Sequence, residues 1–110
     1  MSKRSLPPIT HLQFLVLGLL LHGEEPGRQV RQALARHGVR RTAPAFYQMM
    51  ARLEDAGLVD GRYEQKIVDG QILKERLYVA TATGHRAWTA TRDFYMAAAE
   101  AAGTLEAVHA

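Results

Sequence analysis

The stretch RRTAPAFYQMMARLEDAG, residues 40–57, decides the fold, because it predicts a short helix with two unlike faces. Thr42 suits the N-cap, a proline follows where a missing N–H costs nothing, and Gly57 is expected to end the helix. One face is apolar, with Phe46, Met49, Met50 and Leu53 at three- and four-residue spacing. The opposite face carries Pro44, Tyr47, Gln48, Ala51, Arg52 and Asp55. We therefore expect one side of this helix to be buried and the other to be available for binding.

A second short helix is predicted immediately upstream. Pro26 suits its first turn, and Gly38 is its expected end. A tight turn containing Arg40 and Arg41 joins the two helices. Two short helices in this order, the second with a polar face, are typical of a helix-turn-helix.

Downstream, residues 58–67 and 74–80 are rich in Val, Ile, Tyr and Leu and predict two strands joined through the Asp69-Gly70 turn signal. A hairpin in this position corresponds to the wing of a winged-helix domain. Its basic residues Lys66, Lys74 and Arg76 are candidates to meet phosphates, although acidic neighbours dilute their charge and a mainly structural hairpin is the alternative. The end of the hairpin is apolar, with Ile67, Val68, Ile72 and Leu73 around the turn.

Two further helices complete the prediction. Thr10 and Gln13 form a capping box before an apolar run, residues 12–21, that His22-Gly23 should end. A last helix begins at Thr81 or Thr83 and is expected to end near residue 102, where Gly103 and Thr104 follow. Pairing with a second copy is favoured over packing on its own domain, because a lone terminal helix would leave apolar area exposed. The residues predicted to dimerise are Phe14, Trp88, Thr91, Phe94, Tyr95, Ala98 and Ala102.

These elements predict a mainly α fold with a small β-hairpin (α+β), a winged helix-turn-helix with an N-terminal helix and a C-terminal dimerisation helix. Residues 1–80 would form the DNA-binding domain, with a flexible tail over 1–8. Residues 81–102 would form the dimerisation helix, and 103–110 a tail. At 110 residues the chain has room for one domain.

Charge indicates an anionic partner. The formal net charge is +3, and the segment from Pro26 to Leu53 contains six arginines and no Asp or Glu. There is no cysteine, the five histidines show no metal-ligand spacing, and Ser2 and Ser5 lie in the tail. We therefore expect no enzyme activity, catalytic residue, metal or cofactor. The apolar run is too short for a membrane span of about 20 residues, and a cytoplasmic protein without membrane contact is expected.

The sequence resembles the PadR-like winged-helix transcriptional regulators. The matching stretches are the leucine-rich first helix into 21–23, the segment from Ala45-Phe46-Tyr47 to Gly57-Leu58-Val59, and 77–81 followed by Gly84. The resemblance implies a homodimer that binds operator DNA, usually as a repressor, with the third helix in the major groove and the last helix at the dimer interface. The chain departs from the family in having Phe46 before and Gln48 after the tyrosine, and in its apolar wing.

The predicted partners are double-stranded DNA and a second copy of the chain. Gln48 is the candidate for reading adenine, because an amide both donates and accepts. Tyr47, Thr42 and the arginines are candidates for phosphate contacts. The full predicted DNA-binding set is Arg40, Arg41, Thr42, Pro44, Tyr47, Gln48, Arg52, Lys66, Lys74 and Arg76. Tyr47 as a buried structural hydroxyl and Arg52 in a salt bridge with Glu54 or Asp55 remain alternatives.

Two other functions stay open at this point. A winged helix can serve as a protein-protein interaction module, for which the apolar wing and the aromatic last helix are the relevant features. An unknown small-molecule effector near Trp88 and Phe14 is the other possibility.

Overall fold

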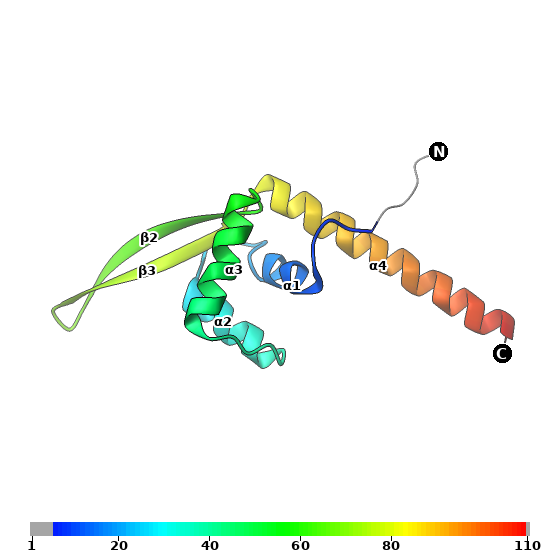
Figure 1. The fold of residues 1–110 in the computed structure, drawn as a ribbon, viewed down its shortest axis with the longest axis horizontal. Helices are drawn as coiled ribbons and strands as arrows, with labels where there is room; N and C mark the ends of the chain where they lie inside the picture. Colours follow the sequence, from blue (N-terminus) through cyan, green and yellow to red (C-terminus); the bar gives the residue numbers. More distant parts are fainter. Residues whose placement is uncertain (1–5, 110) are drawn as a thin grey trace.

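The described part of the chain contains three short helices, a long terminal helix, a hairpin and one further short strand (Figure 1). The computed structural model describes residues 6–109, so most of the tail predicted over residues 1–8 lies outside it. The elements in order are α1 (His11–Leu19), β1 (Glu25–Pro26), α2 (Gly27–Arg36), α3 (Ala43–Asp55), β2 (Val59–Val68), β3 (Gln71–Ala80) and α4 (Ala82–His109). The fold class is the predicted one, a winged helix-turn-helix of the α+β type.

The core lies where α1, α2 and α3 meet the base of the hairpin. Each helix contributes the apolar positions that its three- and four-residue spacing predicted. The fully buried side chains include Val16, Leu17 and Leu20 from the first helix and its end, Val30 and Leu34 from α2, and Phe46, Met50 and Leu53 from α3. Val59 and Tyr78 close the core from the strands.

The sheet has three antiparallel strands in the order β1-β3-β2. The short strand β1 was not predicted; Glu25 pairs with Tyr78 and Pro26 with Leu77. β2 and β3 pair from Val59↔Ala80 to Val68↔Gln71. Asp69 and Gly70 form the two-residue turn with φ of 51° and 76°, a type I′ geometry that suits a tight hairpin. Because the turn is this short, β3 begins at Gln71 and is longer than predicted.

Several predicted element ends were wrong. α1 stops at Leu19, since the amide of Leu20 already bonds the Leu17 carbonyl at 3.0 Å in a tighter turn. Pro26 is the N-cap residue of α2 and also pairs in the sheet. α4 continues through Gly103 to His109 instead of ending near residue 102. A helical glycine costs only about 1 kcal/mol relative to alanine, and the hydroxyl of Thr104 donates back to the Glu100 carbonyl within the helix.

α4 has two unlike halves. Its first turns pack on α1 and on Leu58, the residue before β2, and Gly84 lies so close to the Leu58 carbonyl that a β-carbon would overlap it. Farther along, α4 projects beyond the body of the protein (Figure 1). The hairpin projects in the opposite direction, which gives the molecule its elongated shape of 66 × 30 × 23 Å.

Candidate nucleic-acid interface

α3 presents the predicted binding face to solvent. Thr42 caps the helix by accepting from the Ala45 amide at 3.3 Å, and Pro44 stands in the first turn. While Phe46 is buried, the other face is open: the exposed residues are Pro44, Tyr47, Gln48, Ala51 and Arg52. The helix therefore has one face fixed in the core and one available to a partner, as the sequence predicted.

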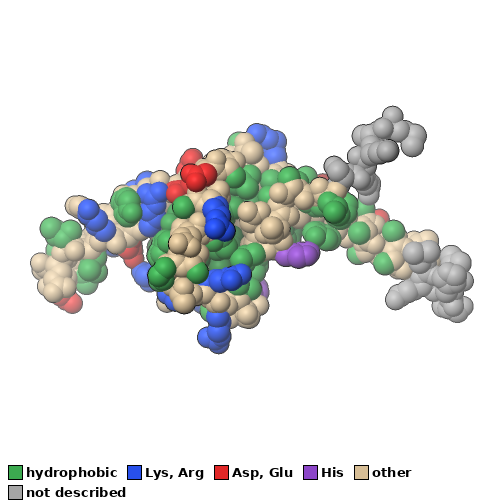
Figure 2. Space-filling model, in the orientation of Figure 1, with side chains coloured by type: hydrophobic (Ala, Val, Ile, Leu, Met, Phe, Trp, Pro, Cys, Tyr) green, Lys and Arg blue, Asp and Glu red, His purple; other side chains and the backbone are tan. Residues whose placement is uncertain are grey.

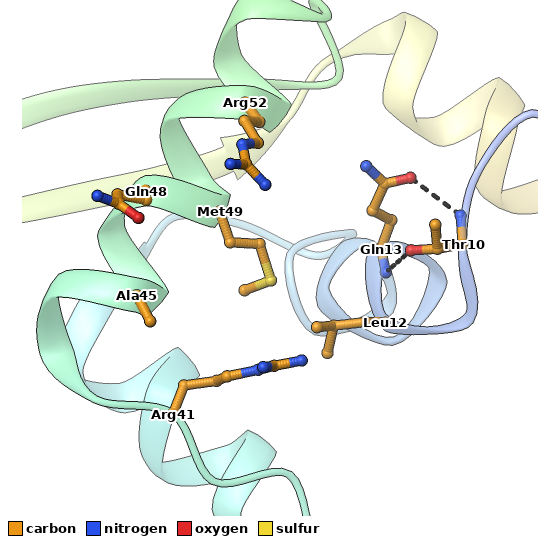
Figure 3. Close-up of a pocket in the computed structure, with 8 residues that line it drawn as sticks. All are labelled: Thr10, Leu12, Gln13, Arg41, Ala45, Gln48, Met49 and Arg52. Atoms are coloured by element: carbon orange, nitrogen blue, oxygen red, sulfur yellow. Dashed lines mark hydrogen bonds between the residues drawn. The ribbon is translucent and has the colours of Figure 1, made fainter.

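A hollow of 340 Å³ lies between α3 and the start of α1 (Figure 3). Arg41 reaches across it toward Leu12, and Gln48 points away from Met49 toward the outside. The N-terminal turn of α1 borders the hollow, where the predicted capping box is present: the Gln13 amide donates to Thr10 Oγ1 at 3.1 Å, and the Thr10 amide donates to Gln13 Oε1 at 2.9 Å. Sequence reasoning did not place α1 beside this face, because the pairing of the two helices is not a local property.

The arginines near α3 carry positive charge that is not neutralised within the described chain. Arg40, Arg41 and Arg52 are exposed, and none of them has an ion pair among residues 6–104. Arg52 therefore forms no salt bridge with Glu54 or Asp55 there. Arg31 donates to the Arg41 carbonyl at 2.8 Å and so fixes the turn that carries two of these arginines. Figure 2 shows Lys and Arg side chains gathered over this part of the molecule.

Two of the three basic residues predicted on the hairpin are engaged within the chain. Arg76 Nη2 lies 2.5 Å from Glu54 Oε1, and its guanidinium stacks over the Tyr63 ring at 4.6 Å. Lys66 Nζ lies 3.0 Å from Glu75 Oε2. Lys74 has no ion pair among the described residues and borders a second hollow, of 440 Å³, between α3 and the hairpin. Arg76 thus joins α3 to the hairpin, and the predicted phosphate contacts of the hairpin remain predictions, with Lys74 the one of the three without an ion pair among the described residues.

The ion pair between Glu54 and Arg76 is the feature of this region that sequence reasoning missed. It connects α3 to β3, and Gly61 on β2 makes room for it, because a β-carbon there would overlap the Glu54 carboxylate. A glycine inside a strand pattern signals such a close approach, so Gly61 was the available clue. We call this contact of Glu54, Arg76 and Gly61 the α3–hairpin clamp.

Tyr47 lies at the edge of the binding face and is 39% exposed. Its ring packs edge-on against Phe46, with centroids 5.1 Å apart, and borders Gly27 at the start of α2. The side chain as a whole is therefore not buried, but its hydroxyl lies beside Gly27, so a phosphate contact and a structural role both remain predictions. The neighbouring Tyr78 is buried, and this burial raises its pKa to about 12, so its hydroxyl stays protonated.

Salt bridges also hold the hairpin to the body on the side of α2. Arg28 Nε lies 2.7 Å from Glu75 Oε1, and Arg62 binds Glu24 through two contacts of 2.6 and 2.7 Å. Hydrogen bonds from Arg28 and then Lys66 hold the pKa of Glu75 below its usual value, and Arg62 does the same for the pKa of Glu24. Arg28 is therefore neutralised, although it belongs to the basic segment that the sequence singled out.

The residues predicted to dimerise divide into two groups. Phe14 and Trp88 stack on each other within the chain, with centroids 5.4 Å apart and planes 9° apart, and Thr91 is only 1% exposed. The helical repeat of α4 turns these positions toward α1, so Thr91 is buried in its own chain and the prediction for it was wrong. Tyr95, Ala98 and Ala102 are exposed, and Phe94 is half-buried.

Within the described residues, no group of three or more His, Cys, Asp or Glu side chains could hold a metal ion. No described helix is long and apolar enough to cross a membrane.

No protein-family model matches the sequence, and no curated protein matches it. Solved structures do. A PadR family transcriptional regulator from Eggerthella lenta has a TM-score of 0.68 at 26% identity, covering 86% of this chain and 80% of that one. A PadR family regulator from Clostridium difficile has a TM-score of 0.72 at 12% identity, with 87% and 98% covered. Bacillus subtilis PadR, solved in complex with operator DNA, has a TM-score of 0.61 at 22% identity, covering 74% of this chain and 46% of that one.

The arrangement of α2, α3 and the hairpin defines a winged helix-turn-helix protein. Within that class the chain is PadR-like, as its matching stretches predicted, and its structure is similar to that of PadR family transcriptional regulators.

Proposed function

We propose that this protein is a sequence-specific DNA-binding regulator, acting as a repressor, that places α3 in the major groove of operator DNA. The observation that carries the proposal is the exposed face of α3, where Gln48 lies among Arg41 and Arg52, neither of which has an ion pair among residues 6–104. Cations there would supply affinity through phosphates, and the amide would supply base discrimination. The PadR structure with operator DNA supports the same use of the fold.

The proposal includes a homodimer formed through the projecting part of α4. Met96 is 60% exposed there, and Ala98 and Ala102 allow close approach of a second helix. Tyr95 marks the start of this part, since it is 40% exposed and its ring still contacts His11 of α1. Two copies related by a twofold axis would bind a roughly palindromic site whose half-sites are about 34 Å apart, one turn of DNA.

The decisive experiment is binding to DNA from around the protein's own coding locus, measured over a salt series. The experiment compares a triple variant with a double variant as control. The triple variant is Arg40→Ala, Arg41→Ala, Gln48→Ala. The control is Arg86→Ala, Arg92→Ala, which also loses two positive charges, from exposed positions on α4. We expect tight, site-selective, salt-sensitive binding that only the first variant loses. If wild type and both variants bind alike, or no site is preferred, operator binding by α3 is wrong.

A sharper comparison separates base reading from phosphate binding. Gln48→Ala should cost about 1–3 kcal/mol for the preferred site while leaving binding to other sequences unchanged, because only a base contact is lost. Arg52→Ala should weaken binding to all sequences and lower the salt slope by about one. Competition titrations with single-base operator variants measure both. If Gln48→Ala weakens binding to every sequence equally, the assignment of Gln48 to base recognition is wrong.

The interaction-module alternative is favoured by one observation, the apolar end of the hairpin. Ile67 and Ile72 are 78% and 68% exposed there.

A further inference from the structure

The outer edge of β2 has no partner strand among the described residues. β2 lies outermost in the sheet order β1-β3-β2, and the hairpin projects away from the helices along most of its length (Figure 1). An open strand edge presents unpaired N–H and C=O groups, which is a template for pairing with another chain.

The turn fixes which backbone groups face that edge. In a two-residue turn the flanking pair, here Val68 and Gln71, exchanges hydrogen bonds, and along an antiparallel ladder such pairs alternate with pairs that do not. Residues 62, 64, 66 and 68 of β2 therefore direct their N–H and C=O groups toward β3. Residues 63, 65 and 67 direct theirs outward, so three consecutive outward positions are available for another strand.

The side chains at these positions are unusually apolar for a free edge. Tyr63 and Ile67 lie on the same face of the strand and are 68% and 78% exposed. The guanidinium of Arg76 stacks on the Tyr63 ring and so restricts its position. Over residues 60–76 the chain carries four acidic and four basic residues. A neutral, apolar edge neither attracts DNA nor repels a second copy.

The edge is complementary to itself in the register that pairs residues 63, 65 and 67 with one another. We infer that the outer edge of β2 binds the same edge of a second copy, antiparallel, with Gln65 on the twofold axis. In this register residues 63, 65 and 67 all meet outward-facing backbone groups of the partner, which satisfies the hydrogen-bond alternation. Tyr63 then lies opposite the partner's Ile67, and Glu64 lies opposite the partner's Lys66. Aromatic pairs with β-branched residues and pairs of opposite charge are the favourable cross-strand combinations.

This contact is distinct from the pairing proposed for α4, and it does not depend on DNA binding. It joins two three-stranded sheets into one of six strands. Because each contact has its own twofold axis, a chain that uses both either closes into a tetramer or extends into a row of dimers.

Proline substitution tests the contact by removing one outward N–H. Gln65→Pro deletes a donor that points away from β3, so the ladder of the hairpin survives. Lys74→Pro is the matched control, because Gln65 pairs with Lys74 and the Lys74 amide points to the opposite edge. We call the dimer proposed to form through α4 the α4-linked unit. In sedimentation velocity from low micromolar to millimolar protein, wild type and Lys74→Pro should reach twice the mass of this unit. Gln65→Pro should not show this doubling, and its thermal unfolding shows whether it is folded. A wild type that never exceeds one α4-linked unit would overturn the inference, as would equal loss in both variants.

Single cysteines test the register by cross-linking. The chain has no cysteine, so Gln65→Cys and Tyr63→Cys each introduce one thiol. Opposed residues of a hydrogen-bonded pair lie about 5.5 Å apart at Cα, within the range of a disulfide. The two residues 63 would instead be about 14 Å apart, because four residues separate each from its partner. We expect oxidative cross-linking of Gln65→Cys only. Cross-linking of Tyr63→Cys alone, or of neither variant, would overturn the register.

Discussion

At the scale of single residues, the most consequential contact is the α3–hairpin clamp. Glu54 and Arg76 are both about three-quarters buried, with side chains 24% exposed, so their pairing is less screened by water than a surface ion pair. Gly61 admits the pair, and Tyr63 and Tyr78 flank the guanidinium at 4.6 and 5.7 Å. The clamp thereby fixes the hairpin relative to the helix proposed to read DNA.

Gly61→Ala should break the clamp. The added methyl group would displace the Glu54 carboxylate and leave Arg76 without its partner, so we expect the free energy of unfolding to fall by about 1–3 kcal/mol. Chemical denaturation monitored by circular dichroism measures this. The triple variant Gly61→Ala, Glu54→Ala, Arg76→Met should be little less stable than Glu54→Ala, Arg76→Met, since neither the ion pair nor the overlapping side chain at residue 54 remains. An unchanged midpoint for Gly61→Ala would contradict the assigned role.

Glu75 predicts a pH dependence whose sign follows from its neighbours. Its pKa is lowered in the folded protein, chiefly by Arg28, so the stabilisation is present above the ordinary value of 4.5 and disappears as pH falls through the lower folded value. Glu75→Gln should therefore unfold at a lower temperature than wild type at neutral pH. The difference should narrow below pH 4.5 and vanish in stronger acid. Thermal unfolding of both proteins over a pH series checks this, and a difference that persists in acid would rule out the linkage.

At the scale of elements, local signals predicted the helices and their starts. Thr10 with Gln13 and Thr42 are caps whose partners lie within three residues, so the sequence contains the whole interaction. β1 could not be predicted in this way, because its two residues are a strand only through pairing with β3 about fifty positions later. The ion pairs of Lys66 and Arg76 were missed for the same reason, because the sequence does not show whether a basic residue is free or paired with a distant acid.

The continuation of α4 through residue 103 predicts a simple gain. A β-carbon at Gly103 would meet nothing within 4 Å, and the residue is helical. Gly103→Ala should therefore stabilise the distal part of α4 by about 1 kcal/mol and raise its helical content. Circular dichroism at a fixed concentration, with Gly38→Ala as a control that should destabilise because φ is +83° there, distinguishes the two kinds of glycine. A loss of helical content in Gly103→Ala would show that α4 ends before this residue.

At the scale of the whole molecule, the body, the hairpin and the end of α4 lie along one long axis (Figure 1). The exposed face of α3 and the basic turn were predictable, because helical spacing and charge are local properties. The division of α4 into a packed part and a projecting part was not predictable, because a repeat of aromatic residues does not show whether α1 or a second copy covers those residues. Trp88 stacks on Phe14 of α1, and the ring of Tyr95 still contacts His11 of α1, with centroids 5.6 Å apart. The surface proposed for a partner therefore begins at Met96, which is 60% exposed.

This division predicts where α4 is sensitive to charge. Ala98→Glu with Ala102→Glu should separate the proposed dimer, because carboxylates would be buried between helices without partners. Ala82→Glu is the control, since it places the same charge on an exposed residue at the other end of α4. Sedimentation equilibrium should give half the mass for the double variant and the wild-type mass for the control, with operator affinity reduced only in the former. An unchanged mass in the double variant would place the dimer contact elsewhere.

The stacking of Trp88 on Phe14 also provides a spectroscopic reporter. The chain contains a single tryptophan, and it lies at the junction between α1 and α4, with the guanidinium of Arg92 5.3 Å from the centre of its ring. The tryptophan fluorescence of the unlabelled protein therefore originates from the contact between α1 and α4. Any ligand or operator that alters the angle of α4 will change that emission, so coupling between the two ends of the molecule can be followed in the native chain.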